Sequence, residues 1–238
     1  MSILLHELSF QGGVRPSPFC WHTRFALEHK GLAYTSVPTP FTGIPGIAGG
    51  GQKTVPVIED AATGVEAKRR TIADSWVIAE YLEAAYADRP SLFGVGGKAH
   101  ALFLRNWLAS AVRLPMLKTI LLDIYNAVQP EDRAYFRSSR EQRFGATLED
   151  FAADRAAQLG VVRANLEPLR VTLAEQPYLS GAAPLYPDYL VAGYMLWWRA
   201  VCPTCLFDDA DPLASWFARV IALYPRIAAE SARTWNGP

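Results

Sequence analysis

Residues 17–30 read SPFCWHTRFALEHK, and this stretch predicts how the rest of the chain is arranged. Serine is a favoured helix N-cap and proline is favoured at the first helical position, so a helix should begin at Pro18 with Ser17 as its cap. A helix start presents free backbone N–H groups and the positive end of the helix dipole, which favour a bound anion. The hydroxyl of Ser17 is therefore either a simple cap or a group that stabilises a bound thiolate.

Cys20 lies three residues after Ser17, the spacing of a redox C-x-x-C motif whose first cysteine is missing. Without an exposed first thiol, disulfide exchange has no nucleophile. Cys20 falls on the third helical position, and we expect its side chain to pack in the protein interior.

The segments on either side of this helix predict two parallel strands. Residues 3–5 (ILL) and 33–37 (AYTSV) have the apolar, aromatic and β-branched content of strands. A strand, a helix that ends near Gly31 and a second strand form a βαβ unit, which implies parallel pairing. Residues 38–52 then hold three prolines and five glycines, so we expect a long irregular loop there.

The next segments should complete a small α/β unit. Residues 54–58 read TVPVI, a strand pattern that contains Pro56. Proline cannot donate to a strand ladder, so it belongs at a sheet edge, a strand start or a special geometry. We expect Val65 to close a hairpin with this strand, and residues 72–86 to form an amphipathic helix.

Residues 88–97 mark a change in composition, with Pro90 and three glycines. Beyond them we find only helical periodicity, in segments 98–127, 131–175, 188–200 and 212–229. We therefore predict a small α/β domain over residues 1–88 and an all-helical domain over residues 98–238.

The composition restricts the classes of function. Half of the residues are apolar and 19% are charged, which is typical of a globular chain. With 23 basic and 23 acidic residues, the net charge gives no case for nucleic acid or an anionic membrane as partner. Three cysteines are too few for a disulfide framework and indicate a reducing compartment. The N-terminus lacks the basic region of a signal peptide, and the apolar run 190–198 is too short for a membrane span, so we expect a cytoplasmic protein.

This order of segments resembles the glutathione S-transferase superfamily over nearly the whole chain. The resemblance implies a thioredoxin-like α/β domain followed by an all-α domain, glutathione as co-substrate, no metal, and a homodimer. Its carriers are Ser17-Pro18 at the first helix, TVPVI at 54–58, ADSWVIAEYL at 73–82, YLSG at 178–181, and Asp188.

Within the superfamily, the chain is most similar to the serine-type bacterial lignin β-aryl-etherases and the fungal FuA-class transferases. The segments that carry this closer likeness are FTGI at 41–44, DSWVIAEYL at 74–82, RP at 89–90, NWL at 106–108 and SREQ at 139–142.

The resemblance assigns glutathione-binding roles to five residues. Ser17 would be the catalytic hydroxyl beside the glutathione sulfur. Pro56 would be cis, leaving the N–H and C=O of Val55 to bond the cysteinyl backbone; the alternative is an ordinary edge-strand proline. Asp74 and Ser75 would hold the γ-glutamyl end, a role compatible with capping the helix that they open.

Other contacts of the site are less well defined by the resemblance. Gln52 and Lys53 are the nearest candidates for the glycyl carboxylate, although Lys53 and Thr54 depart from the etherase pattern. The acceptor should bind between the domains, against the first two long helices. Aromatic residues at helical spacing are more often core, so we choose Trp107, Met116 and Tyr125 from a candidate set that also includes Leu114, Leu117 and Phe144.

Two further features have mainly structural interpretations. Leu185 stands where the superfamily usually has a serine or threonine N-cap, so half of the capping box with Asp188 is missing, and we expect Asp188 to be structural and more weakly held than usual. Cys202 and Cys205 have metal or redox spacing, but no second pair completes a site, and we expect a loop with two buried thiols. The four histidines form no ligand pattern.

These observations favour a glutathione transferase in which the thiolate attacks a hydrophobic, aromatic electrophile, with β-aryl ether cleavage as one form of the reaction. A hydrogen bond to a charged group contributes about 1.5–3 kcal/mol, enough to lower a thiol pKa from about 8.5 to near 7. Two other classes remain open. A non-catalytic binding protein for apolar aromatics would give no product, and a thiol-disulfide reductase would need an exposed, reactive Cys20.

Overall fold

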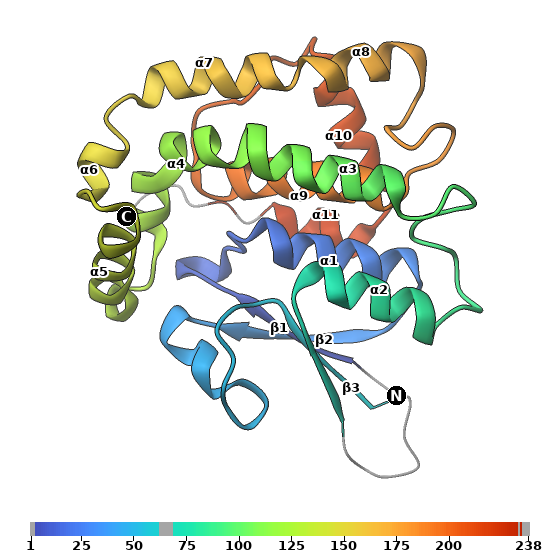
Figure 1. Cartoon of the computed structure of the whole chain (residues 1–238), viewed down its shortest axis with the longest axis horizontal. Helices are drawn as coiled ribbons and strands as arrows, with labels where there is room; N and C mark the ends of the chain where they lie inside the picture. The colour runs from blue at the N-terminus through green and yellow to red at the C-terminus, as the bar shows by residue number, and fades with distance from the viewer. Residues whose placement is uncertain (1–2, 62–68, 233, 235–238) are drawn as a thin grey trace.

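The computed structural model describes residues 3–61, 69–232 and 234. Its N-terminal part is a four-stranded mixed sheet in the order β2-β1-β3-β4, in which β1 is parallel to β2 and β3 is antiparallel to both neighbours. Figure 1 shows α1 and α2 between this sheet and the remaining helices. The elements are β1 (Ile3–Leu8), η1 (Gln11–Gly13), α1 (Pro18–His29), β2 (Tyr34–Thr39), η2 (Phe41–Gly49), β3 (Val57–Asp60), β4 (Arg70–Ala73) and α2 (Ser75–Ala85).

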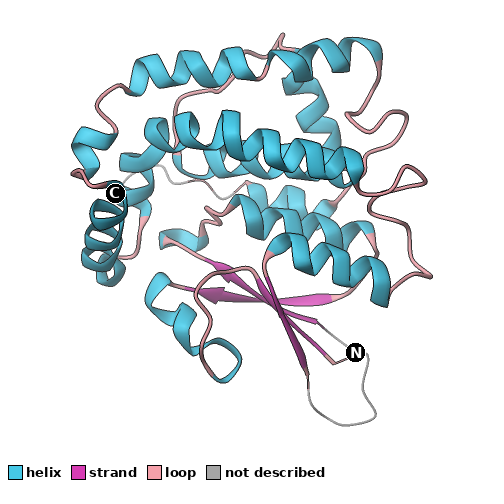
Figure 2. Ribbon diagram, viewed as in Figure 1, coloured by secondary structure: helices cyan, strands magenta, loops and turns pink. Residues whose placement is uncertain are grey.

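The rest of the chain is helical in its described residues, as Figure 2 shows, and the two-part architecture expected from the sequence is confirmed. The predicted helical segment 131–175 is divided into several helices. Gly145, with a φ of 67°, ends the first of them in the left-handed region. The elements are α3 (Ala99–Trp107), a π-helical turn (Leu108–Val112), α4 (Arg113–Ala127), η4 (Pro130–Asp132), α5 (Arg133–Phe144), α6 (Leu148–Phe151), α7 (Arg155–Asn165), α8 (Glu167–Glu175), α9 (Tyr186–Val201), α10 (Pro212–Ala222) and α11 (Pro225–Ser231).

The predicted βαβ unit is confirmed, but the helix predicted over residues 72–86 begins later. Ile72 lies in β4, where it pairs with Ile58 across the sheet. The chain leaves the strand at Asp74, which has a φ of 76° and caps α2. The predicted helix therefore included the end of β4, a strand that is defined by its pairing with β3. Val65, expected to close the hairpin, lies outside the described residues.

The proline- and glycine-rich segment 38–52 is more regular than predicted. Its first two residues complete β2, and 3-10 turns follow over η2. The carboxylate of Asp132, 1% exposed, accepts hydrogen bonds from the backbone N–H groups of Phe41, at 2.6 Å, and Thr42, at 3.2 Å. The hydroxyl of Thr42 donates to the same carboxylate at 2.7 Å. A residue of the helical domain thus caps the start of η2.

A buried ion pair fixes α1 to the sheet. Arg24 of α1 donates through Nε to the Glu7 carboxylate of β1 at 2.6 Å, and both side chains are 0% exposed. Arg15, just before α1, lies 3.3 Å from the same carboxylate and donates to the Ser9 hydroxyl at 2.6 Å. Removing one member of such a pair would leave an unpaired buried charge, so the start of α1 is held in a defined place.

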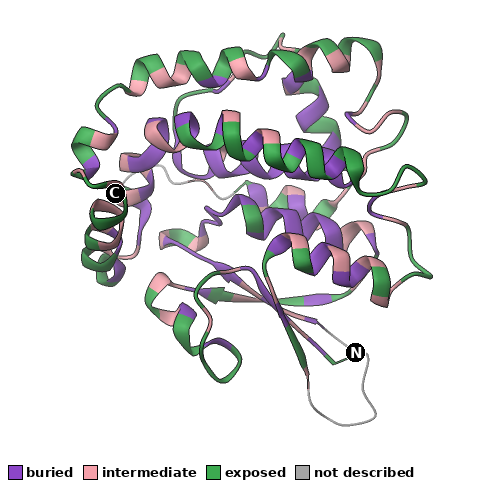
Figure 3. Cartoon of the chain, viewed as in Figure 1, coloured by how far each residue is buried: buried purple, intermediate pink, exposed green. Residues whose placement is uncertain are grey.

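Helix α9 is the centre of the helical domain and is buried along nearly its whole length (Figure 3). This burial explains the apolar run at 190–198. Gly193 lets α9 approach α1 closely, because a Cβ there would lie 2.4 Å from the His22 ring and 2.9 Å from the Pro18 carbonyl oxygen. The two helices could not pack at this distance with a larger residue at position 193.

Asp188 is structural, as expected, but the expectation that it is weakly held is wrong. Its buried carboxylate accepts hydrogen bonds from the backbone N–H groups of Leu179, at 2.8 Å, and Leu185, at 3.2 Å, and from the Trp216 indole at 2.9 Å. Leu185 offers no side-chain acceptor, so the indole and the loop before α9 supply the bonds that hold Asp188.

The cysteine loop differs from its prediction at one position. Cys202 is buried, but Cys205 is exposed, so only one of the two thiols packs inside. Within residues 3–61, 69–232 and 234, no group of three or more His, Cys, Asp or Glu side chains could hold a metal ion. Over the same ranges, no helix has both the length and the apolar character required to cross a membrane.

Candidate functional site

Ser17 is the N-cap of α1, as the sequence predicted. Its backbone is extended, its hydroxyl oxygen accepts a hydrogen bond from the Cys20 N–H at 3.3 Å, and Pro18 occupies the first helical position. Ser17 is 8% exposed, so its hydroxyl faces little bulk water. This places a polar O–H at the positive end of a helix, where a negative charge is stabilised.

Cys20 is 1% exposed, which confirms that it packs inside. Burial raises the pKa of its thiol to about 12, although a hydrogen bond with Ser17 acts in the opposite direction. A thiol in this state is neither accessible nor ionised at neutral pH. The structure therefore contradicts the thiol-disulfide reductase hypothesis, which needed an exposed and reactive Cys20.

A cavity of about 530 Å³ lies where the N-terminal domain meets the helices, and we call it the serine cavity because Ser17 lines it. Its lining is mainly apolar and aromatic, as in sites that bind small organic ligands. Phe10, Phe41, Leu114, Leu117, Phe144 and Trp197 contribute to this lining.

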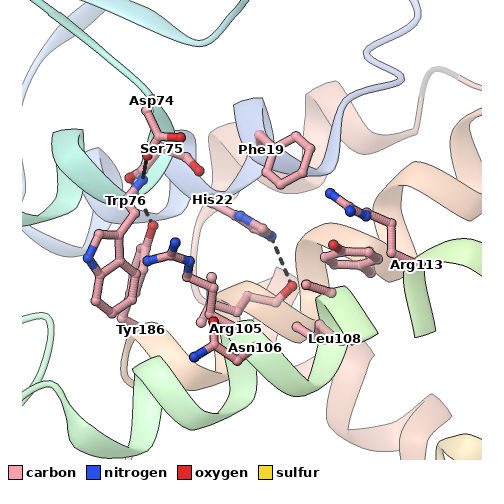
Figure 4. A pocket seen from close by; sticks show the side chains of 13 residues that line it. Phe19, His22, Asp74, Ser75, Trp76, Arg105, Asn106, Leu108, Arg113 and Tyr186 are labelled. Atoms are coloured by element: carbon pink, nitrogen blue, oxygen red, sulfur yellow. Dashed lines mark hydrogen bonds between the residues drawn. The ribbon is translucent and has the colours of Figure 1, made fainter. Parts of the chain in front are cut away.

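A second cavity of about 260 Å³, which we call the aspartate cavity, lies at the start of α2 and is shown in Figure 4. Asp74, the N-cap of α2, and Ser75, its first residue, line it, and Arg105 and Asn106 line it from α3. Phe19, Ala109 and Arg113 line both cavities, so the two are adjacent and share a wall.

The start of α2 combines a helix cap with an unusual backbone. The Asp74 carboxylate accepts hydrogen bonds from the N–H groups of Trp76, at 2.8 Å, and Val77, at 3.2 Å. Ser75 is 7% exposed, and its carbonyl accepts a hydrogen bond from the Tyr186 hydroxyl at 3.1 Å. A positive φ at a residue other than glycine is uncommon and clusters at ligand sites. The predicted cap is confirmed, and both side chains also face a cavity.

The Val55–Pro56 peptide bond is cis, as the resemblance implied. It precedes β3, an interior strand of the sheet, so the edge-strand alternative for Pro56 is wrong. Among the described residues, neither the N–H nor the C=O of Val55 has a hydrogen-bond partner. The N–H of Asp74 donates to the carbonyl of Pro56 at 3.3 Å, which places this turn beside the start of α2.

Several predicted site residues lie away from the two cavities. Met116 is 0% exposed in the core of α4, and Trp107 and Tyr125 are half-buried residues that pack against that core. None of the three lines either cavity, so the two cavities do not support their choice over other residues of the same helices, and their role toward an acceptor stays a prediction. Periodicity identified the helices but not which face of each meets the cavity.

Gln52 and Lys53 follow three glycines that all have positive φ values. Gln52 is half-buried and Lys53 is exposed, and neither lines the serine cavity or the aspartate cavity. Their role toward a glycyl carboxylate stays a prediction.

Four arginines of the two cavities were not predicted from the sequence. Arg105 lies with its guanidinium carbon 4.9 Å from the centre of the Trp76 ring, beside Ser75 in the aspartate cavity. Arg113, Arg140 and Arg143 line the serine cavity. One of them, Arg140, belongs to the SREQ segment that carries the closer family likeness. The balanced net charge of the chain gave no indication that basic residues gather at one cavity.

His22 lies in the wall of the aspartate cavity and connects α1 to α9. Its Nε2 lies 2.9 Å from the carbonyl oxygen of Leu190, so Nε2 carries the proton and donates. Its Nδ1 is buried without a hydrogen-bond partner among the described residues. Burial lowers the pKa of His22 to about 3, so the ring is neutral at physiological pH.

Comparison with solved structures shows the same fold in several proteins. A glutathione S-transferase of Ceriporiopsis subvermispora, crystallised in complex with glutathione, matches with a TM-score of 0.80 and 22% identity over 95% of this chain and 98% of its own. The transferase GSTFuA2 of Phanerochaete chrysosporium matches with a TM-score of 0.76 and 25% identity over 97% of this chain and 98% of its own.

Two family models match consecutive parts of the chain. The glutathione S-transferase N-terminal domain matches residues 16–85, a range that includes Ser17, Val55 and Asp74. The glutathione S-transferase C-terminal domain matches residues 99–205, which include α4 and α9, two helices that line both cavities. With these matches and the fold, the chain belongs to the glutathione S-transferase superfamily.

Proposed function

We propose that the protein is a glutathione transferase that binds glutathione across the two cavities and directs its thiolate at a hydrophobic, aromatic electrophile. The observation that carries this proposal is the hydroxyl of Ser17, placed at the start of α1 in the wall of a large apolar cavity. The complex of the Ceriporiopsis subvermispora transferase with glutathione supports glutathione as the ligand.

The residues present suit the parts of the tripeptide. Asp74 offers a carboxylate to the γ-glutamyl ammonium, while Ser75 and Arg105 offer donors to its carboxylate within one cavity. The N–H and C=O of Val55, without partners in the described part of the chain, suit the cysteinyl backbone. The hydroxyl of Ser17 then donates a hydrogen bond to the glutathione sulfur.

The reaction requires little covalent chemistry from the protein. The thiol loses its proton to solvent, the sulfur forms a bond to the electrophilic carbon, and the leaving group departs with the electrons of the broken bond. Ser17 and the N-terminus of α1 stabilise the thiolate, and the apolar walls hold the electrophile near it. Activation of the thiolate and proximity are the two sources of rate.

A β-aryl ether is a specific candidate for the electrophile, with a phenoxide as leaving group. The closer resemblance of the sequence to etherases and FuA-class transferases favours this reaction, and the aromatic side chains Phe10, Phe41 and Phe144 suit an aryl substrate.

We also propose a cytoplasmic homodimer, as the resemblance implies. Val77 of α2 and Leu102 and Phe103 of α3 are exposed apolar side chains that a partner copy would cover. Light scattering that gives the mass of a single chain would contradict this state.

The direct test is retention on immobilised glutathione, followed by mass spectrometry of thioether products with aryl ethers, halides, epoxides and peroxides. We expect retention and a glutathione conjugate with at least one aromatic electrophile. Tight binding of apolar aromatics without any product would favour the non-catalytic binding protein instead.

A further inference from the structure

The serine cavity carries a charge of one sign in an otherwise apolar lining. Arg113 of α4 and Arg140 and Arg143 of α5 line it. Of the described residues that line it, none is Asp or Glu. A neutral aromatic compound would offer these three guanidinium groups no negative charge to pair with.

Arg140 is held by aromatic rings without being neutralised. Its guanidinium carbon lies 4.6 Å from the ring centre of Phe41 and 4.6 Å from that of Phe136. Its Nη1 donates to the hydroxyl of Ser139 at 2.9 Å. Burial lowers the pKa of Arg140, the interaction with Tyr135 acts in the opposite direction, and the charge of Arg143 lowers it further. Stacking on two rings fixes the position of the group and leaves its charge for a ligand.

Arg113 begins α4 directly after the π-helical turn Leu108–Val112 and lines the wall shared by the two cavities. π-helical turns inside helices are frequent at functional sites. Within the described residues, neither Arg113 nor Arg143 forms an ion pair, whereas Arg137, also on α5, pairs with Glu141 at 2.8 Å. The arginines of the cavity thus differ from arginines used to stabilise the helical surface.

We propose that the acceptor of this transferase is an aromatic acid, whose ring packs in the serine cavity and whose carboxylate is bound by Arg140 and Arg143, with Arg113 adding charge at the junction. This inference rests on the proposed function and adds the class of the electrophile. A guanidinium matches a carboxylate in shape and charge, and such charge-assisted hydrogen bonds are about twice as strong as neutral ones.

A matched pair of electrophiles tests the proposal. 4-Chloro-3,5-dinitrobenzoate and 4-chloro-3,5-dinitrobenzamide share the ring and the chloride leaving group and differ in charge. After division by the uncatalysed rates, kcat/KM should be roughly ten-fold or more higher for the benzoate. The Arg140→Gln/Arg143→Gln double variant removes both groups assigned to the carboxylate and should lose most of this ratio. Arg143 is exposed and Arg140 half-buried, and circular dichroism checks that the fold is retained. Arg133→Gln, on α5 but outside the cavity lining, is the control that keeps the ratio.

Three results would overturn the proposal. The wild type could show equal corrected kcat/KM values for the benzoate and the benzamide, the double variant could keep the wild-type preference for the benzoate, or the double variant could differ from the wild type only in a higher KM for glutathione. Calorimetric titration with unreactive 3,5-dinitrobenzoate and 3,5-dinitrobenzamide separates this inference from the proposed function. If no electrophile gives a thioether but the benzoate binds selectively, the proposed function fails and the anion site stands. Equal binding of the two compounds rejects the anion site.

Discussion

Ser17 serves two physical roles with one oxygen atom. It accepts the hydrogen bond of the Cys20 N–H that caps α1, and it lines the serine cavity. A cap residue is fixed by the helix that it starts, so its hydroxyl keeps a defined direction relative to a ligand at the helix terminus. The position of the Ser17 hydroxyl in the cavity wall is therefore set by the local backbone structure.

Replacing Ser17 by alanine should lower kcat/KM roughly ten- to hundred-fold near pH 6.5, because one hydrogen bond to a charged sulfur is lost. The pH at which the rate is half-maximal should move from near 7 toward about 8.5, the pKa of a free thiol. Initial rates from pH 5.5 to 9.5 measure both effects. Ser110→Ala is the matched control, because Ser110 lines the same cavity but its hydroxyl donates to the Trp107 carbonyl. An unchanged pH profile in the Ser17 variant would contradict the assigned role.

His22 should make the protein less stable in acid. Its pKa in the folded state, about 3, lies below the ordinary value of 6.5. Below pH 6.5 the unfolded chain therefore binds a proton that the folded chain does not, and stability falls as the pH is lowered. At pH 5 this difference amounts to roughly 2 kcal/mol.

Urea unfolding of His22→Gln at pH 7 and pH 5 measures the contribution of this residue. The variant should lose about 2 kcal/mol less than the wild type between these pH values, because carboxylates contribute equally to both. His100→Gln, at an exposed position of α3, should retain the wild-type loss. Equal losses in the wild type and the His22 variant would show that His22 is accessible to protons in the folded state.

At the scale of single residues, local signals gave reliable predictions. The cap at Ser17, the burial of Cys20 and the cis bond before Pro56 each depend on neighbours in sequence or on a motif of the family. The placement of Arg113 and Arg143 in one cavity lining could not be predicted in this way. These residues come from different helices and line the same cavity only because the helices pack around it.

At the scale of elements, the packing of α1 on α9 depends on the absence of a side chain at one position. The space that Gly193 leaves is filled by the ring of His22, whose Nε2 then reaches the Leu190 carbonyl. Because α1 carries Ser17 at its start, this contact also positions the cavity wall.

Gly193→Ala should destabilise the protein by about 1–3 kcal/mol, because the new methyl group would overlap with both the His22 ring and the Pro18 carbonyl. Gly160→Ala is a matched control in α7, where a Cβ would meet nothing within 4 Å. In that helix alanine should instead stabilise by about 0.5–1 kcal/mol. Chemical denaturation of both variants measures the change in the free energy of unfolding, which should be a loss for Gly193→Ala and a gain for Gly160→Ala. An unchanged free energy of unfolding in the Gly193 variant would show that the helices can separate without cost.

Boundaries of elements were predicted less well than their existence. β4 was missed because the short segment Arg70–Ala73 is a strand only by virtue of its pairing with β3. The turn at Asp74 that separates β4 from α2 needs a positive φ. A glycine at this position would have predicted such a φ, but an aspartate does not. Both errors arise where partners distant in the chain decide the local conformation.

At the scale of the whole molecule, one continuous hydrophobic core joins the sheet and the helices. It extends from Ile3 of β1 to Ile227 of α11, and a small second cluster of Ile44, Ile47 and Val57 lies in the N-terminal domain. Polar contacts add to it, since Gln11 donates to the Val128 carbonyl at 2.8 Å and the Tyr186 hydroxyl donates to Ser75. The main core is therefore shared by both domains.

We therefore expect the chain to unfold in a single transition. Tryptophan fluorescence and far-ultraviolet circular dichroism in urea should give the same midpoint, since loss of either domain exposes the core of the other. Two separated midpoints would show that the helical domain is stable without the sheet.

The bond between Asp132 and the start of η2 has a consequence for recombining this protein with its relatives. A chimaera that takes residues 1–88 from one parent and the helices from another would keep the contact to Phe41 only if the second parent also supplies a carboxylate at position 132. Without that carboxylate, a crossover at residue 88 would displace Phe41, against whose ring the Arg140 guanidinium packs. Chimaeras that take positions 41, 42 and 132 from one parent should retain that parent's acceptor specificity better than chimaeras that separate them.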